Sequence, residues 1–358
     1  MKNSRLTWAT LDWAALDRLR DTFLAVQSTG ADYWMSRSDL ENYDFTFAQR
    51  IAWKWDAVLR ELGLRGWAPP PGPLLDWGCG SGVAGRRVVG FFGPVHFHSL
   101  RLFDRSPLAI CFAAEAARKE FPRLRIESWP PETAGPAGDS EPRTPIRRES
   151  TRASLPEPAG PQRGARSIGT LVVSHVLNEL DEGGGRKLRA AIERAEAVIW
   201  VEPGTYADSR SLIAWREALC ESFRVVAPCT HQAACGLRSP ENARHWCHHF
   251  ANLPAGVMAD SNWVRFARRA GIDLRSLPYS FLALERKGLR EPLPGLLPDG
   301  YSRFIGRPRI YKGFARIFNC QSSGVRDLTL QKRDAPELFK AFKNRTAPPV
   351  YRWDSIVT

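Results

Sequence analysis

The chain has 358 residues, of which 43% are hydrophobic and 25% charged, so it can bury a core and is expected to form two or three structural units. No apolar run approaches the roughly 18 residues that span a bilayer, which excludes a membrane-spanning protein. The formal charge of +13 is high for a metabolic enzyme and indicates contact with phosphates.

Residues 1–70 are predicted to be a helical N-terminal region. The segments 11–26 and 45–62 carry apolar residues at spacings of three and four, which is typical of helices that pack on a core. A polar stretch separates them, and a run of prolines after residue 68 ends the region.

Residues 71–225 alternate strand-like and helix-like segments, which predicts a doubly wound, Rossmann-like α/β domain with a parallel sheet. Residues 130–167 interrupt this pattern with eight prolines, four glycines and few large apolar side chains. Such a segment cannot bury enough surface to offset the entropy lost on ordering, so it is predicted to be a disordered insertion.

A glycine-rich turn, LLDWGCGSG, follows the first strand of this domain at residues 74–82. It begins at Asp76, and Gly78, Gly80 and Gly82 would let the backbone approach a ligand. Asp104 ends the second strand, where a carboxylate can accept both ribose hydroxyls of a nucleoside. The glycines alone are weak evidence, since a turn kept for tight helix packing would look the same.

The glycine turn, Asp104 and the segment SHVLNEL together resemble the class I S-adenosylmethionine (SAM)-dependent methyltransferases over roughly residues 70–205. The resemblance implies that Asp76 and residues 78–82 line the methionine and ribose of SAM and that Asp104 holds the ribose. It also implies that Leu177, Asn178 and Glu179 border the methyl donor.

Catalytic residues are not evident in this domain. SHVLNEL replaces the Asn/Asp-Pro-Pro-aromatic turn that holds a base amino group, and neither it nor WVEPGT supplies a thiolate for attack on a pyrimidine. His175 or Glu202 could act as a general base, although a histidine on a strand is more often a structural residue. Cofactor binding is therefore better supported than catalysis, and the catalytic residues stay unknown.

The acidic residues Asp12, Asp17 and Asp21 argue against an organelle transit peptide, so a cytoplasmic, bacterial protein is expected. In that reducing compartment the seven cysteines are not expected to form disulfides. Three of them stand singly and are interpreted as small buried hydrophobes, namely Cys79, Cys111 and Cys220.

The segment 226–260 gathers Cys229, Cys235 and Cys247 in a polar loop and is predicted to be a metal-binding unit. A closed site needs a fourth ligand, and the candidates are His231, His245, His248, His249, Cys220 and Cys320. Structural zinc sites usually use closely spaced cysteine pairs, which the loop lacks. An iron-sulfur cubane accepts more varied spacing, which favours Cys320 and iron-sulfur, while zinc stays open as the alternative.

Residues 261–358 are predicted to be a basic segment of antiparallel strands that ends in a short helix over 335–344. From Tyr301 onward, twelve Lys and Arg residues accompany four acidic residues, a local excess of +8. RNA is the predicted partner, and a solvated basic face without a ligand is the alternative.

The motifs PCTHQAACGL and HWCHHF, followed by RIYKGFARIFNCQSSG, resemble methyltransferase-like assembly factors of the small ribosomal subunit, over most of the chain. This resemblance implies a 4Fe-4S cluster on Cys229, Cys235, Cys247 and Cys320, and binding to small-subunit rRNA and to proteins of the immature subunit. The free protein is expected to be a monomer, with methyl transfer doubtful. The alternatives are an active rRNA methyltransferase and a zinc-bearing RNA-binding module with a vestigial methyltransferase fold.

Overall fold

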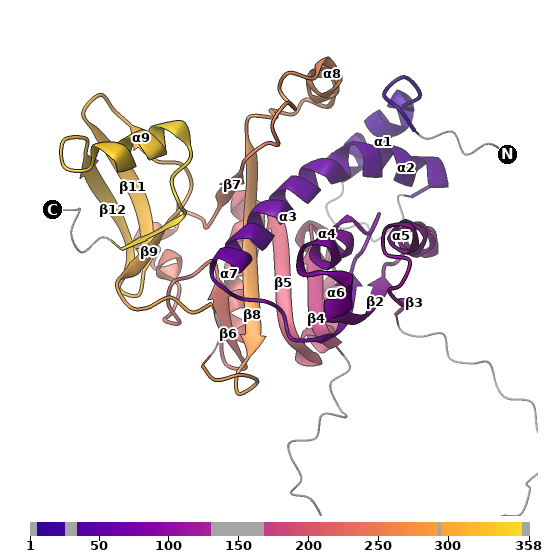
Figure 1. Cartoon of the computed structure of the whole chain (residues 1–358), viewed down its shortest axis with the longest axis horizontal. Helices are drawn as coiled ribbons and strands as arrows, with labels where there is room; N and C mark the ends of the chain where they lie inside the picture. The colour runs from indigo at the N-terminus through magenta and orange to yellow at the C-terminus, as the bar shows by residue number, and fades with distance from the viewer. Residues whose placement is uncertain (1–5, 26–33, 130–167, 293–294, 353–358) are drawn as a thin grey trace, which may run out of the picture.

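The fold contains two sheets, which lie side by side in the computed structural model (Figure 1). The structure describes residues 6–25, 34–129, 168–292 and 295–352, so the predicted insertion at 130–167 lies outside the described residues. Within these ranges no helix is long and apolar enough to cross a membrane.

The larger sheet has the strand order β3-β2-β1-β4-β5-β8-β6, and β7 pairs with β8. The first five strands in this order run parallel to one another, whereas β8 is antiparallel to β5, β6 and β7. Its strands are β1 (Gly72–Trp77), β2 (Phe97–Phe103), β3 (Ile126–Ser128), β4 (Ile168–Ser174), β5 (Ala195–Pro203), β6 (Phe223–Ala227), β7 (His249–Ala251) and β8 (Leu277–Arg286).

Helices cover both faces of the larger sheet because successive strand residues point to opposite sides. Leu74 and Val172 pack with helices on one face, and Leu75 and Leu171 pack with helices on the other. The first face carries α3 (Phe47–Leu64), α4 (Val83–Phe92), α5 (Pro107–Glu120) and α8 (Ser261–Ala270); the second carries α6 (Glu182–Glu193) and α7 (Tyr206–Leu219).

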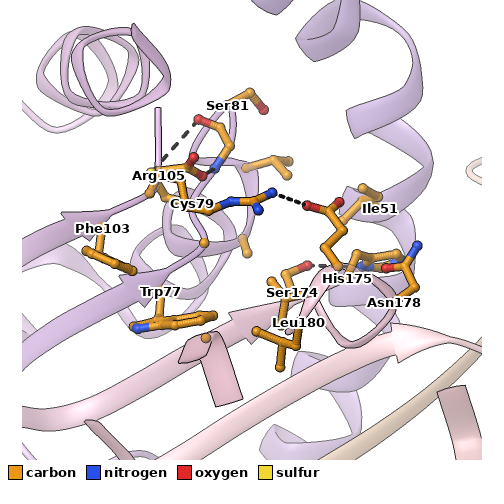
Figure 2. Close-up of a pocket in the computed structure, with 18 of the residues that line it drawn as sticks. Ile51, Trp77, Cys79, Ser81, Phe103, Arg105, Ser174, His175, Asn178 and Leu180 are labelled. Carbon is orange, nitrogen blue, oxygen red and sulfur yellow. Dashed lines mark hydrogen bonds and ion pairs between the residues drawn. The ribbon is translucent and has the colours of Figure 1, made fainter. Parts of the chain in front are cut away.

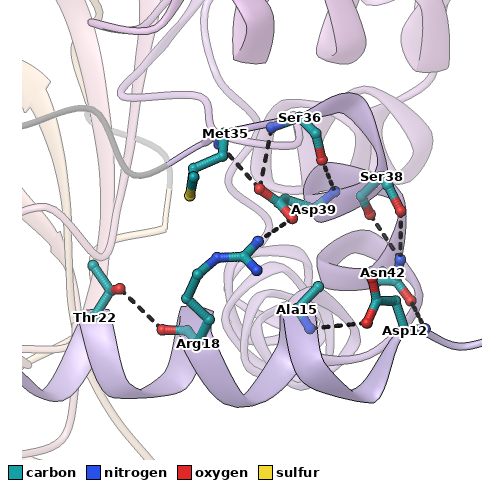
Figure 3. Close-up of polar contacts among 9 residues, drawn as sticks. All are labelled: Asp12, Ala15, Arg18, Thr22, Met35, Ser36, Ser38, Asp39 and Asn42. Carbon is teal, nitrogen blue, oxygen red and sulfur yellow. Dashed lines mark hydrogen bonds and ion pairs between the residues drawn. The ribbon is translucent and has the colours of Figure 1, made fainter.

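The N-terminal helices α1 (Trp13–Ala25) and α2 (Arg37–Phe45) are joined by buried polar contacts (Figure 3). Asp39 accepts hydrogen bonds from the backbone N–H of Ser36 at 3.1 Å and from the Arg18 guanidinium at 2.5 Å. Ser36 in return caps the helix through the Asp39 N–H, which completes a capping box. The cap therefore both starts α2 and fastens it to α1.

The smaller sheet is antiparallel, with the order β10-β11-β9-β13 and β12 paired with β11. The helix α9 (Pro336–Asn344) buries Phe339 and Phe342 against this sheet beside Ile317. The strands are β9 (Tyr301–Phe304), β10 (Arg309–Ile310), β11 (Phe314–Gln321), β12 (Gly324–Gln331) and β13 (Val350–Arg352).

The predicted α/β fold with a helical N-terminal region and a basic, β-rich C-terminal segment is confirmed, and so is the terminal helix. Two details differ. The expected boundary at residue 260 does not divide the sheets, because β8 lies inside the larger sheet between β5 and β6. The polar stretch before residue 45 contains α2, which its capping box and buried Leu40 stabilise despite few apolar residues.

Candidate functional site

The glycine turn after β1 has a backbone conformation that residues with a side chain rarely adopt. Gly78 and Gly82 have φ angles of +71° and +77°. A Cβ on Gly78 would lie 2.7 Å from the Val176 side chain, and one on Gly82 would lie 2.8 Å from the Cβ of Ala113. The turn therefore packs closely against two neighbouring elements.

Asp104, directly after β2, holds this turn in place. Its carboxylate accepts hydrogen bonds from the Gly80 N–H at 2.8 Å and from the Ser106 N–H at 3.0 Å. Because parallel strands end at one edge of the sheet, the ends of β1, β2 and β4 come together there.

A cavity of about 450 Å³ opens at this edge (Figure 2). The predicted site residues Gly78, Gly80, Asp104, Asn178 and Glu179 line it. An ion pair of 3.3 Å joins Arg105, after β2, to Glu179, after β4. The volume falls in the usual range for small-ligand sites.

Three predicted site residues, Asp76, Gly82 and Leu177, are not among the described residues that line the cavity. Asp76 is fully buried behind the turn, where its Oδ2 accepts the Gly85 N–H at 2.9 Å at the start of α4. Burial raises the pKa of Asp76 to about 7. Asp76 thus contacts the start of α4 and not the cavity.

The wall opposite the glycine turn comes from α3 and the end of β4. The Lys54 ammonium lies 3.1 Å from Nε2 of His175, and Nδ1 of His175 lies 3.1 Å from the Ser174 hydroxyl. Trp55 donates its indole N–H to the same hydroxyl at 2.9 Å. His175 has a φ of +55°, which is uncommon outside glycine and holds its ring in the cavity wall.

The electrostatics of this wall follow from burial. Burial, and then the charge of Arg50, lower the pKa of Lys54 to about 7. Burial and then Lys54 lower the pKa of His175 well below its ordinary value, so its ring is neutral. The candidate base Glu202 is fully buried. It accepts hydrogen bonds from the Val176 N–H and the Trp200 indole N–H, so the contacts of its carboxylate are structural.

Arg50 and Lys54 are functional candidates that the sequence interpretation missed. Both line the cavity from α3. They stand four residues apart, on the face of the helix that also carries apolar residues. Basic residues on a face that is expected to be buried are the sequence signal that could have indicated them.

The four cysteines predicted as metal ligands come from separate elements. Cys229 follows β6, Cys235 and Cys247 lie in the loop before β7, and Cys320 lies on β11 in the smaller sheet. Cys235, Cys247 and Cys320 pack in one apolar cluster with Ile213 and Ile305.

The four thiols lie within electrostatic reach of one another. Burial raises the pKa of Cys320 well above its ordinary value, and so do Cys229, Cys247 and Cys235, in that order. Burial and then Cys229 raise the pKa of Cys235 to about 11. Among the described residues, however, no group of three or more His, Cys, Asp or Glu side chains is arranged to hold a metal ion.

Two of the candidate histidines lie beside these thiols. Nε2 of His231 is 3.4 Å from the Cys320 sulfur, and Nε2 of His249 is 3.7 Å from the Cys247 sulfur. His245 packs on the Phe318 ring and His248 stacks on Trp246. His231 is thus the histidine best placed to replace a thiolate as fourth ligand.

The cysteine loop contacts α3 on one side and the smaller sheet on the other. Arg65 at the end of α3 donates to the carbonyls of Val226, Pro228 and Cys229 at 2.8 to 3.2 Å. Gly236 lies so close to the start of β12 that a Cβ on it would be 2.9 Å from the Gly324 backbone. The loop therefore lies between the cavity domain and the smaller sheet.

The strand order β3-β2-β1-β4-β5-β8-β6, with β8 antiparallel to both neighbours, defines the class I SAM-dependent methyltransferase fold. Residues 151–347, more than half of the chain, match a protein-family model described as mitochondrial small ribosomal subunit Rsm22. The chain belongs to the Rsm22 family. A search of the curated proteins finds no match.

Solved structures that resemble the chain include three methyltransferases. Magnesium protoporphyrin IX methyltransferase from Synechocystis, with bound SAM, has 14% identity and a TM-score of 0.35, covering 78% of this chain and 99% of that one. A Leishmania major SAM-dependent methyltransferase has 15% identity and a TM-score of 0.34, covering 76% and 82%. M. capricolum TrmK, with S-adenosylhomocysteine, has 8% identity and a TM-score of 0.31, covering 65% and 71%.

Proposed function

We propose that this protein is an rRNA-binding assembly factor of the small ribosomal subunit that binds SAM and carries a 4Fe-4S cluster. The observation that carries the proposal is the match to the small-subunit family, because the matched residues include the cysteine loop and most of the basic sheet. Ribosomal proteins of the immature subunit are the further partners.

The cavity supports SAM binding through its own residues. Asp104 lines the cavity and would hold ribose hydroxyls, and Gly78 and Gly80 of the glycine turn line the same cavity. Bound SAM would supply an electrophilic methyl group. We expect Asp104→Asn to weaken S-adenosylhomocysteine binding by at least about tenfold, since hydrogen bonds to charged groups contribute about 1.5 to 3 kcal/mol. Calorimetry measures this affinity. The control is Asp56→Asn, because Asp56 is half-exposed and does not line the cavity.

The cysteine chemistry supports an iron-sulfur cluster. Burial, and then Cys229, raise the pKa of the Cys235, Cys247 and Cys320 thiols, because thiolates this close repel one another, and a cationic cluster core would relieve that repulsion. The ligands would be Cys229, Cys235, Cys247 and Cys320, and the cluster would join the loop to β11 with a structural role. If anaerobically purified protein held stoichiometric zinc and no iron, the zinc-bearing alternative would replace this proposal.

The smaller sheet supports RNA binding by its charge and by one exposed aromatic pair. At the tip between β10 and β11, the rings of Tyr311 and Phe314 stack with centroids 4.5 Å apart, and Tyr311 is 45% exposed. Exposed Lys312 lies between them in the chain. Exposed aromatic faces beside cations suit unpaired bases.

Salt dependence of binding to small-subunit rRNA tests the proposal. Lys312, Arg326 and Lys332 are exposed and have no ion-pair partner among the described residues. Replacing all three with glutamine should weaken binding at least about tenfold at low salt and reduce the salt slope by about 2 to 3. The control variant replaces three exposed basic residues of the larger domain, and it should leave the salt dependence of RNA binding unchanged. These residues are Lys119, Arg123 and Arg268.

Active methyl transfer is the second candidate function, and the hydrogen-bonded Lys54–His175 pair in the cavity wall favours it. The neutral ring of His175 would accept a proton from the methylated group. Incubation of immature small subunits with radiolabelled SAM separates the two candidates. Incorporation that Asp104→Asn abolishes would make the protein an enzyme, whereas absent incorporation with intact RNA binding supports the assembly factor.

A further inference from the structure

Two cationic side chains line the cavity without a counter-ion. Arg50 and Lys54 stand one helical turn apart on α3, and both line the space that the glycine turn also borders. Within the described part of the chain, neither forms an ion pair, and the Nε of Arg50 is buried without a hydrogen-bond partner. Lys54 is only 9% exposed, and its described contact is the neutral ring of His175.

Buried, unpaired cations are costly and need a functional or structural reason. Burial lowers the pKa of Arg50 to about 10 and is also the largest cause of the lowered pKa of Lys54. A ligand that brings a negative charge would replace the lost hydration of both groups. The structure thus prepares a place for an anion at this end of the cavity.

We propose that Arg50 and Lys54 form an oxyanion subsite that holds the carboxylate of the amino-acid end of SAM. The proposal rests on the proposed SAM binding and extends it to the residues that select the amino-acid end. Asp104, Glu179 and Asp181 line the same cavity, so its carboxylates oppose a phosphate dianion more strongly than a single carboxylate, whose charge the two cations can match.

The subsite is held in shape before the ligand binds. The Trp55 indole fixes the Ser174 hydroxyl, this hydroxyl contacts Nδ1 of His175, and Nε2 of His175 contacts Lys54. A ligand carboxylate would therefore find the ammonium already positioned, which reduces the ordering that binding requires.

Binding at this subsite should depend on pH. The charged or titratable groups that face Lys54 are Arg50 on its own helix, His175 after β4, Glu202 on β5 and Asp208 on α7. A carboxylate favours the charged ammonium and raises its pKa in the complex, so binding takes up a proton when the pH exceeds about 7. Affinity for a ligand with the carboxylate then falls as pH rises, by at most about tenfold per pH unit.

Calorimetric titration with S-adenosylhomocysteine and with 5′-methylthioadenosine, which lacks the amino-acid end, tests the proposal. We expect Arg50→Gln and Lys54→Met each to weaken S-adenosylhomocysteine binding about 10- to 100-fold and to change 5′-methylthioadenosine binding less than about twofold. Lys119→Gln, an exposed lysine on α5 that is not among the residues lining the cavity, should change neither affinity. Between pH 7 and 8.5, Lys54→Met should remove the pH dependence.

Each other outcome is informative. Equal loss of both ligands, or no loss of either, overturns the carboxylate subsite while leaving the adenosine site intact. Unchanged S-adenosylhomocysteine affinity with reduced rRNA binding would assign the two cations to an RNA phosphate and overturn it as well. Failure of the unaltered protein to bind either nucleoside would refute the proposed SAM binding itself.

Discussion

Replacing Cys320 with serine should remove the iron of the proposed cluster from anaerobically prepared protein, from about four atoms per chain to less than about one. Cys320 lies on β11, far along the chain from the three loop cysteines, yet after burial, the largest cause, all three of them raise its pKa. A cluster that loses this ligand loses its hold on the smaller sheet, and because metal binding is coupled to folding, solubility should fall with it. Iron and sulfide analysis checks the result.

Two comparisons separate metal loss from a packing defect. Cys235→Ser should lose as much iron as Cys320→Ser, whereas Cys111→Ser should lose none. The interpretation of Cys111 as a buried residue is wrong, because it is exposed on α5. After iron removal by a chelator, the unaltered protein and Cys320→Ser should unfold at similar temperatures. Full iron content in Cys320→Ser would show that the fourth ligand is another residue, and His231 would be the next to test.

The alternation of buried segments sufficed to predict the α/β sheet, because parallel strands covered on both faces read as short apolar runs. The place of β8 could not be predicted in this way. Its side chains are as apolar as those of β4, but the pairing of Trp200 with Leu282 spans a long stretch of chain. Strand neighbours that distant depend on packing of the whole domain and leave no local pattern.

The part of the candidate site that could be predicted is the part whose residues lie close together in one motif. Asp104 and the glycine turn lie together as their spacing indicated. Asp76 has the same type of side chain, but its carboxylate turns toward the N-terminus of α4. Arg50 and Lys54 escaped prediction because basic residues on a helix are usually solvated, and only the packing of α3 across the strand ends buries them.

Replacing Glu61 with alanine should lower the free energy of unfolding by about 3 to 5 kcal/mol, because it leaves two buried guanidinium groups without a counter-ion. Glu61 on α3 is 6% exposed and pairs with Arg65 at 2.9 Å and with Arg303 of β9. Arg65 also holds the carbonyls that lead into the cysteine loop. One carboxylate therefore connects the cavity helix, the loop and the smaller sheet, and chemical denaturation measures its contribution.

The exposed pair of Asp17 with Arg269, 2.7 Å long, provides the control, and Asp17→Ala should cost no more than about 1 kcal/mol. Burial alone would raise the pKa of Glu61, but Arg303 and Arg65 outweigh it and lower the pKa below its ordinary value. The stabilisation is therefore complete above about pH 4.3, the unfolded pKa, and is lost as pH falls through the lower folded pKa. Equal losses in the two variants at pH 7 would contradict the bridging role of Glu61. If the difference between the stability losses of Glu61→Ala and Asp17→Ala disappears on acidification, the charge of Glu61, rather than the volume of its side chain, joins the two sheets.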